Sequence, residues 1–467
     1  MSTEPQASPE KEPLKETSNG ISRRTFVKGA GLAVASFYFF PRHVLGGPGF
    51  VAPSDKLNIA GIGVGGRGAS VLRNMATQNI VALCDVDFGF AAKTFAEYPN
   101  AKTFKDYRVM LDKMGRDIDA VMIATPDHSH AIIALEALRR KKHLYVEKPL
   151  TYTVEEARLL TAAAKKARMI TQMGNQGHSN PEGMQAVEMI RNGDIGQVST
   201  VHAWTNRPIW PQGMPRTTQT FGMPPTLDWD LFIGPAPLRP YNPAYHPFKW
   251  RGWADYGVGA LGDMGAHLLD HPNWALELGA PVSVQASCTP WGGTKEEPMV
   301  SYPLASQVTF EFAAKGNRGP VQLIWSDGGI APARPEEMTD EEPLGDRGGG
   351  VLYLGDKGKL VHNTYGAKPR LIPVSRMQGY APPTPTIPRI ETTHEMDWVN
   401  CCKDGKRQPS SSFDYSGPLT ETMLLGVIAT RFPGKKLLWD AAAMKFTNLP
   451  EANQYLGRQY RVGFGLS

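Results

Sequence analysis

A short stretch near the middle of the chain carries an imidazole between two carboxylates. Asp263, His267 and Asp270 are spaced D-x-x-x-H-x-x-D, so on one helix all three side chains share a face. An imidazole flanked by carboxylates is a good general base near neutral pH, and Asp263 can fix its tautomer or share a substrate hydroxyl. Two other interpretations stay open: a helix-capping Asp beside a buried, hydrogen-bonded His, and a divalent metal site. We predict the general base and no metal.

Two further polar motifs follow short apolar runs that are typical of strands. Thr125-Pro126-Asp127-His128-Ser129-His130 comes at the end of residues 120–124, and Glu147-Lys148-Pro149 follows residues 144–146. The carboxyl ends of neighbouring parallel strands are where such sheets bind ligands. A lysine at that edge is suited to holding a ribose or substrate hydroxyl. Without the neighbouring motifs it would equally well be a surface lysine before a turn.

A glycine-rich turn follows the first predicted strand, residues 57–62. Gly61, Gly63 and Gly66 fit G-x-G-x-x-G, in which glycines let a pyrophosphate approach a helix N-terminus. Asp85 ends the next predicted strand, about 20 residues on, where an acidic side chain binds the adenosine ribose and repels a 2′-phosphate. This predicts NAD, with NADP as an open alternative because Arg67 can reach a phosphate. The predicted cofactor contacts are Gly61, Gly63, Gly65, Gly66, Arg67, Asp85, Thr125, Pro126, His130, Glu147 and Lys148.

Short apolar runs alternate with helical stretches from residue 57 to residue 178. Further strands are expected at 80–85 and 170–173, and helices at 66–75, 128–139 and 154–168. Such alternation predicts a parallel, doubly wound α/β sheet, the Rossmann dinucleotide-binding fold.

The pattern changes from residue 179 onward. Ser179-Asn180-Pro181 begins a helix with a polar cap and a proline in its first turn. Runs at 198–204, 307–312 and 321–325 alternate apolar and polar residues between long loops rich in Pro, Trp and Gly. We expect an α+β domain over residues 179–467 with a large, mostly antiparallel open sheet, whose C-terminal helices can pack back on the first domain.

These motifs together resemble, in order and spacing, the glucose–fructose oxidoreductase/inositol dehydrogenase (Gfo/Idh/MocA) family. The resemblance runs from about Lys56 to near the C-terminus. It implies a first domain that binds NAD or NADP and a second whose open antiparallel sheet packs beside the nicotinamide. It also implies that Lys148 positions the reacting hydroxyl and that Asp263 and His267 are the catalytic pair, with His267 removing the proton. The carbon-bound hydrogen then leaves as hydride to the nicotinamide.

Polar and aromatic residues in the second domain suit a sugar or polyol. Arg207 follows Trp204-Thr205-Asn206, and Lys249 opens Lys249-Trp250-Arg251. Aromatic faces with Asn and Arg side chains fit sugar rings and hydroxyls, although most such aromatics pack in cores. His394-Glu395, near the start of a late helix, is expected to be a capping and surface feature. The predicted substrate contacts are Arg207, Lys249, Asp263 and His267.

The N-terminus predicts export. Ser22-Arg23-Arg24-Thr25-Phe26-Val27-Lys28 and the uncharged run at 29–40 resemble a twin-arginine (Tat) signal, an address read by the export machinery. We expect a leader over residues 1–47, a linker over 48–56 and a periplasmic protein, with an uncleaved N-terminal anchor as the alternative. The uncharged run is shorter than the about 20 residues of a stable membrane span.

Charge and cysteine content exclude some classes of binding partner and structural support. The formal net charge is only +5 and no Lys/Arg block lies beside aromatic residues on a candidate binding face, so nucleic acid is not an expected partner. The four cysteines show neither zinc spacing nor a disulfide framework, which fits a chain that folds in the reducing cytoplasm before export. An exposed face on the second sheet would favour a homo-oligomer.

An exported dehydrogenase meets no free NAD pool. We therefore expect a tightly bound cofactor that each turnover restores, through a second reducible substrate or through redox-neutral chemistry. The predicted function is an NAD(P)-dependent sugar or polyol oxidoreductase. The alternatives are a redox-neutral NAD-dependent glycoside hydrolase or lyase, as some enzymes resembling this family are, and a non-catalytic sugar-binding protein. Lys148 in Glu-Lys-Pro favours the oxidoreductase.

Overall fold

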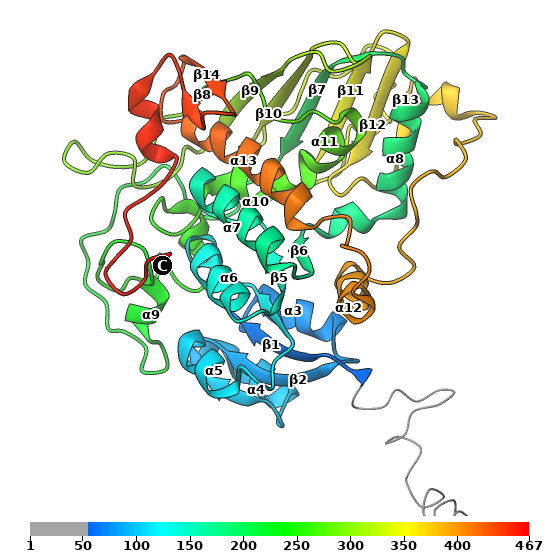
Figure 1. Cartoon of the computed structure of the whole chain (residues 1–467). Coiled ribbons are helices and arrows are strands. Elements are labelled where there is room, and N and C mark those ends of the chain that lie inside the picture. Colours follow the sequence, from blue (N-terminus) through cyan, green and yellow to red (C-terminus); the bar gives the residue numbers. More distant parts are fainter. Residues whose placement is uncertain (1–54, 467) are drawn as a thin grey trace, which may run out of the picture. The chain divides into compact units, whose positions relative to one another are not determined.

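The computed structural model describes residues 55–466, which fold around two β-sheets with helices packed against them (Figure 1). The predicted leader, with its twin-arginine motif, and most of the predicted linker lie outside the described residues. Within residues 55–466, no helix combines the length and apolarity needed to cross a bilayer.

The first sheet is parallel and has six strands in the order β3-β2-β1-β4-β5-β6. Two βαβαβ halves meet at β1 and β4, so the predicted Rossmann fold is confirmed. β4 is buried along its whole length, as expected of a strand covered on both faces. The strands are β1 (Asn58–Ile62), β2 (Asn79–Cys84), β3 (Lys102–Phe104), β4 (Ala120–Ile123), β5 (His143–Glu147) and β6 (Thr171–Gly174).

Helices connect these strands, and local sequence begins several of them. Asp87 and Asp106 cap α4 and α5, since their carboxylates accept hydrogen bonds from amides in the first turn. Thr153 begins α7 with a capping box, in which Glu156 bonds back to the Thr153 amide. The helices are α3 (Arg67–Asn74), α4 (Phe88–Glu97), α5 (Tyr107–Met114), α6 (His130–Arg139), preceded by the single turn η2 (Asp127–Ser129), and α7 (Val154–Ala167).

The second sheet has nine strands in the order β13-β12-β11-β7-β10-β9-β8-β14-β15. Every neighbouring pair is antiparallel except β7 with β10, so the predicted mostly antiparallel sheet is confirmed. Val308, Phe310 and Phe312 on β9 are buried while Thr309 and Glu311 between them are only half-buried, because only one face packs on helices. The strands are β7 (Val198–Thr205), β8 (Ser283–Cys288), β9 (Ser306–Phe312), β10 (Val321–Ser326), β11 (Gly349–Gly355), β12 (Gly358–Asn363), β13 (Arg370–Ile372), β14 (Lys436–Asp440) and β15 (Lys445–Phe446).

Two late helices pack on the first domain, and one of them, α13, also packs on the second sheet. α13 lies against α7 and also against β8 and β9, and α12 packs on α3, β5 and β6 (Figure 1). The helices are α8 (Pro181–Asn192), α9 (Trp229–Ile233), α10 (Gly259–Leu268), α11 (Asp270–Leu276), α12 (His394–Asp404) and α13 (Phe413–Ala429), with single turns η3 (Gln176–Ser179), η4 (Lys249–Gly252), η5 (Val374–Met377) and η6 (Pro450–Tyr455).

Residues 259–276 form two helices, not one. α10 ends before α11 begins at Asp270. Pro272 lacks the amide that would continue the α10 hydrogen-bond ladder, and its ring would clash with a carbonyl of the preceding turn. The expectation that Asp263, His267 and Asp270 share one helical face is therefore wrong, because Asp270 belongs to the second helix.

Candidate active site

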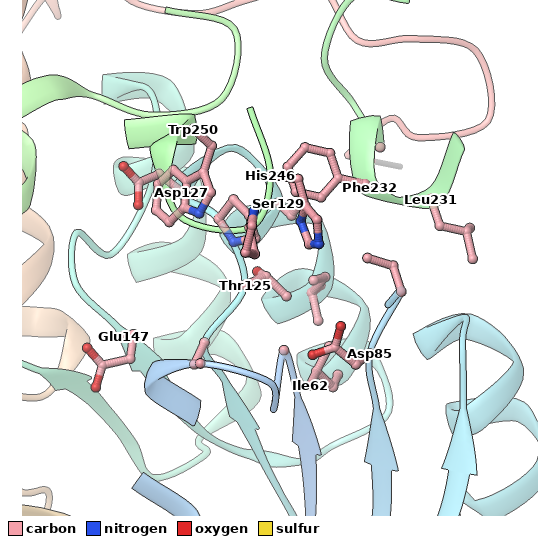
Figure 2. A pocket seen from close by; sticks show the side chains of 18 of the residues that line it. Ile62, Asp85, Thr125, Asp127, Ser129, Glu147, Leu231, Phe232, His246 and Trp250 are labelled. Carbon is pink, nitrogen blue, oxygen red and sulfur yellow. The ribbon is translucent and has the colours of Figure 1, made fainter. Parts of the chain in front are cut away.

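A cavity of about 490 Å³ lies at the carboxyl ends of the parallel strands. Figure 2 shows Ile62 and Asp85 at the ends of β1 and β2, with Thr125 beyond them. His246 and Trp250, from the second half of the chain, form the opposite wall (Figure 2). The cavity thus lies at the switch point between β1 and β4, where doubly wound sheets bind dinucleotides.

The glycine-rich turn leaves no space for side chains at two of its glycines. Gly63 has a φ of +78°, and a Cβ there would lie 2.7 Å from the backbone of Ala124. A Cβ at Gly68 would lie 2.2 Å from the Gly63 carbonyl oxygen, whereas at Gly66 the nearest atom would be 3.5 Å away. The close helix approach expected of the third motif glycine is therefore provided by Gly68, which the motif does not include. Gly65 lies in the turn against the Phe90 ring.

Asp85 holds the same turn from the end of β2. Its Oδ2 accepts hydrogen bonds from the amides of Val64 and Gly65 at 2.8 and 2.9 Å, and its Oδ1 accepts one from the Asp87 amide at 3.0 Å. A carboxylate has about four acceptor positions, so one remains for a ribose hydroxyl. Burial raises the pKa of Asp85 to about 6, although the three amides oppose the shift. The group is mostly ionised at neutral pH, which disfavours a 2′-phosphate. Gly61 lies within β1 beside this turn.

His130 ties together the two strand-end motifs. Its Nδ1 and Nε2 each lie 2.8 Å from a carbonyl oxygen, those of Pro149 and Thr125. Burial lowers the pKa of His130, and the neutral ring donates to one carbonyl at a time. His130 is therefore placed to position the two loops and does not line the cavity. Thr125 and Pro126 do line it, and the Thr125 hydroxyl is buried with no hydrogen-bond partner among residues 55–466, which fits a ligand hydroxyl.

Arg67 pairs with Glu147, the first residue of the Glu-Lys-Pro motif. Arg67 Nε lies 3.2 Å from Glu147 Oε1, and Gln176 donates to the same oxygen at 3.0 Å. Burial raises the pKa of Glu147 against the opposing charges of Arg67 and Lys148. Its second oxygen, Oε2, is buried without a partner in the described part of the chain. This unpaired oxygen is a second polar group that fits a bound polar molecule such as a dinucleotide.

Lys148 and Asp263 form an ion pair between the two parts of the chain. The Nζ–Oδ1 distance is 2.7 Å, and Arg251 Nε lies 3.4 Å from the same oxygen. Burial would raise the pKa of Asp263, but the charges of Lys148 and Arg251 outweigh it and lower the pKa to about 2. Asp263 is therefore ionised at neutral pH, and one carboxylate balances two cations.

His267 lies one helical turn after Asp263 on α10 and is buried. Its ring packs edge-on against Tyr365, with 4.9 Å between ring centroids. Its Nδ1 has no hydrogen-bond partner within residues 55–466, so the predicted fixing of its tautomer by Asp263 is not observed. Burial and the charge of Lys148 lower the pKa of His267 to about 3. The imidazole is neutral at neutral pH, which is the state that accepts a proton.

Asp270 belongs to a different buried cluster. Its Oδ1 lies 2.9 Å from His178 Nδ1 and accepts a hydrogen bond of 2.6 Å from the Tyr415 hydroxyl. These contacts attach α11 to η3 and α13. Within residues 55–466, no group of three or more His, Cys, Asp or Glu side chains is arranged to hold a metal ion.

A second cavity, of about 660 Å³, adjoins the first. Its lining includes His267, Arg207 and Tyr365. Both cavities are lined by Arg67, Glu147, Lys148 and Asp263. The Lys148–Asp263 pair therefore lies where the two cavities meet.

The structure separates the two predicted substrate cations. Arg207 lines the second cavity, whereas Lys249 is exposed and lines neither. Arg251 lies beside Asp263 instead, with its guanidinium 4.2 Å from the centre of the Trp250 ring. Lys249 and Arg251 both lie in the 3₁₀ turn η4. Because a 3₁₀ helix has about three residues per turn, side chains two positions apart point in different directions. The structure thus brings Arg251 into the site and leaves Lys249 outside it.

His394 and Glu395 were expected at the surface, and the structure shows that this is wrong. They are 4% and 1% exposed and line the second cavity, and Thr393 is the residue that caps α12. His394 Nε2 donates to the Met173 carbonyl at 2.8 Å, and its Nδ1 accepts from the Ser179 hydroxyl at 2.6 Å. His394 and Glu395 are buried because α12 packs on β5 and β6 with its first turn facing inward, a tertiary contact that the local sequence does not reveal.

Comparisons with known proteins agree with this arrangement. A family model described as "Oxidoreductase family, NAD-binding Rossmann fold" matches residues 57–175. A second, described as "Oxidoreductase family, C-terminal alpha/beta domain", matches residues 196–292.

Among curated proteins, the chain is similar to an inositol 2-dehydrogenase of Salmonella typhimurium (strain LT2). The two are 30% identical over 147 residues, which cover 30% of this chain and 43% of that protein. A glycosyl hydrolase family 109 protein of Shewanella sp. (strain W3-18-1) is 30% identical over 207 residues, covering 38% of this chain and 45% of that protein. The chain thus aligns with less than half the length of these relatives.

Among solved structures, a levoglucosan dehydrogenase in complex with NADH and levoglucosan has a TM-score of 0.57 and 19% identity, covering 82% of this chain and 99% of that one. An aldose-aldose oxidoreductase from Caulobacter crescentus, complexed with glycerol, has a TM-score of 0.56 and 19% identity, covering 82% and 100%. At these identities the likeness establishes the fold.

Proposed function

Because the chain belongs to the Gfo/Idh/MocA oxidoreductase family, whose first domain is an NAD-binding Rossmann fold, we propose that it transfers hydride between NAD and a hydroxyl-bearing carbon of a sugar or polyol. The observation that carries the proposal is the Lys148–Asp263 ion pair at the junction of two cavities, with a neutral His267 in the second. The first cavity then takes the dinucleotide and the second takes the substrate.

The side chains at this junction suit alcohol oxidation. Lys148 presents N–H donors to the reacting hydroxyl oxygen, and Asp263 keeps the ammonium in place. His267, which is neutral, accepts the hydroxyl proton. When bound, NAD would supply the acceptor for the hydrogen that leaves carbon as hydride, so the alcohol would become a carbonyl. The hydroxyl proton would pass through His267 to water, because the low pKa of His267 does not let the protonated ring persist at neutral pH. In the reverse direction the proton would come from water through His267 to the carbonyl oxygen.

The residues of the first cavity fit NAD. Gly63 permits the tight turn against Ala124, and Gly68 permits the close approach of α3, so the turn and the start of α3 can bind a pyrophosphate. Asp85 keeps an acceptor position for a ribose hydroxyl, and the Thr125 hydroxyl is unpaired within the described residues. We propose NAD over NADP because the Asp85 carboxylate would repel a 2′-phosphate.

We also propose that the protein is exported by the twin-arginine route and works in the periplasm. The support is the sequence Ser22-Arg23-Arg24-Thr25-Phe26-Val27-Lys28 before an uncharged run. The cofactor must then remain bound, and a second reducible substrate or a redox-neutral reaction must restore it. Replacing Arg23 and Arg24 by Lys should leave the protein in the cytoplasmic fraction. Undiminished periplasmic recovery of that variant would contradict the proposal.

The experiment that tests the enzymatic proposal is a screen of sugars and polyols against purified protein loaded with NAD. We expect the absorbance of reduced nicotinamide to rise with at least one of them, and the rise to be lost in Lys148→Ala. If the protein holds NAD but none of these alcohols reduces it, the oxidoreductase assignment fails.

A redox-neutral glycoside hydrolase is the second candidate. The observation that favours it is the similarity to a glycosyl hydrolase family 109 protein, which extends over 207 residues against 147 for the inositol dehydrogenase. Such an enzyme would oxidise a sugar hydroxyl, cleave beside the acidified neighbouring carbon and then reduce the product, so NADH would not accumulate. A chromogenic glycoside in deuterated water separates the two. Cleavage with deuterium uptake and no net NADH identifies the hydrolase, and NADH formation without cleavage identifies the oxidoreductase.

A further inference from the structure

The last described residues of the chain form part of the wall of the first cavity. Residues 458–466, which we name the latch segment, run between α9 and α6 as the red end of the trace in Figure 1. Phe464 of this segment lines the cavity together with Lys105, Tyr107 and Leu231. No motif in the sequence connects the latch segment with nucleotide binding.

Two arginines fix the Phe464 ring in this wall. The guanidinium groups of Arg108 and Arg461 lie 4.7 and 4.4 Å from the ring centre, and Phe464 is 8% exposed. Arg108 also donates a hydrogen bond of 3.1 Å to the Gly463 carbonyl and pairs with Asp106, the cap of α5. The ring is therefore held on the first domain by contacts that do not depend on a ligand.

The latch segment is also attached to both sides of the cavity. Arg461 donates to the carbonyls of Asp230 and Gly234, at 2.7 and 2.8 Å, in and just after α9. Arg458 forms an ion pair of 2.7 Å with Glu156 on α7. The α9 region supplies the wall that faces the parallel sheet (Figure 2), so the latch segment connects that wall to the helices of the sheet.

Phe464 lines the first cavity at the end where the adenosine is expected. Lys105 and Tyr107 follow β3, which neighbours β2, and β2 ends at the predicted ribose ligand Asp85. Lys148, which follows β5, and its partner Asp263 on α10 mark the other end. In a doubly wound sheet the adenosine lies over the half that contains β2 and the nicotinamide over the half that contains β4 and β5.

We propose that the latch segment is part of the NAD site, with Phe464 as the apolar wall beside the adenine, and that it must move before the cofactor can leave. The inference rests on the proposed function, because it requires NAD in the first cavity. An aromatic wall shields the adenine from water, and the contacts of Arg108, Arg458 and Arg461 must be disrupted before the α9 wall can open. The latch segment thus supplies a physical basis for a cofactor that stays bound through export.

Phe464→Ala tests the inference, and Val462→Ala is the matched control because Val462 is 97% exposed in the same segment. Protein loaded with NADH is diluted into excess NAD, and the loss of bound-NADH fluorescence gives the dissociation rate. Loss of the aromatic wall should raise this rate about tenfold or more, with the control unchanged. Equal rates in the wild type and Phe464→Ala would overturn the inference.

Arg461→Gln provides a second test that keeps the Phe464 side chain. It removes the guanidinium that holds the α9 wall, so faster NADH release is expected here too, while thermal unfolding of the NAD-free variants verifies that they fold. If the wild type binds no NADH, the proposed function fails. If it binds NADH but neither variant changes the release rate, only the role of the latch segment is refuted.

Discussion

Lys148 and Asp263 meet at 2.7 Å although 115 positions separate them in the chain. Lys148 follows β5 of the parallel sheet, and Asp263 lies on α10, after β7 of the second sheet. Both residues line both cavities. Molecules bound in the two cavities would therefore share this pair, and the ion pair is the place where a cofactor and a substrate can come together.

Lys148→Ala removes the donor that the proposed reaction requires at the substrate hydroxyl. The rate of NADH formation should fall by about 10²- to 10⁴-fold, while NADH binding measured by fluorescence titration is retained. Lys249→Ala is the control, because Lys249 is an exposed lysine outside both cavities. Equal losses of activity in the two variants would contradict the placement of Lys148 in the active site and of Lys249 outside it.

Asp263→Asn leaves two cations without their shared carboxylate, at a site where the side chains are 13–20% exposed. Removing one partner of a buried ion pair costs about 3 kcal/mol, whereas replacing both partners by apolar residues costs little. Urea unfolding should show this loss in Asp263→Asn and a partial recovery of the free energy of unfolding in the double variant Lys148→Met/Asp263→Leu, in which Arg251 alone lacks its carboxylate. Both variants should be inactive. A double variant no more stable than Asp263→Asn would argue against the pairing.

The lowered pKa of His267 makes a prediction about acid stability. Its pKa is about 3 in the folded protein and about 6.5 in an unfolded chain. Between these values the unfolded chain binds more protons at this residue, so the free energy of unfolding falls as the pH is lowered through that window. His267→Gln removes this contribution and should flatten the decline between pH 7 and pH 4.5 in urea unfolding. An unchanged decline would mean that His267 is not held neutral by burial.

Gly66 and Gly68 are predicted to tolerate Ala very differently. A Cβ at Gly68 would lie 2.2 Å from a backbone oxygen of the turn, whereas at Gly66 it would make an ordinary 3.5 Å contact with Phe90. Gly68→Ala should therefore displace α3 from the turn and weaken NADH binding at least tenfold, and Gly66→Ala should change it by less than about threefold. Fluorescence titration of both variants measures the difference. The reverse order of effects would contradict the described turn.

The first sheet was predictable because its signals are local. Runs such as 57–62 and 120–124 are almost continuously apolar, and strands buried on both faces need no alternation. The strand β3 escaped prediction because it has three residues, none of them buried, so no apolar run marks it. The end of α10 before Asp270 did have a local signal, because Pro272 cannot continue the helix. The D-x-x-x-H-x-x-D spacing nevertheless suggested one continuous helix.

The site was less predictable because orientation and packing decide it. Lys148 and Asp263 were identified from motifs, but the choice of Arg251 over Lys249 depends on how one short turn faces the cavity. Glu395 is buried only because α12 packs on the first sheet. Asp127 stands within a predicted motif, yet its burial, which raises its pKa to about 7 against the charges of Arg251 and Lys148, arises from residues of both domains.

The most direct test is the dinucleotide content of the purified protein after incubation with NAD and removal of the unbound nucleotide. The protein is then denatured, and the released nucleotide is identified by mass spectrometry. A near-stoichiometric amount of NAD or NADH, in clear preference to the 2′-phosphorylated form when both are offered, is the predicted result. Protein that is folded but releases neither dinucleotide would contradict the assignment of the first cavity and everything inferred from it.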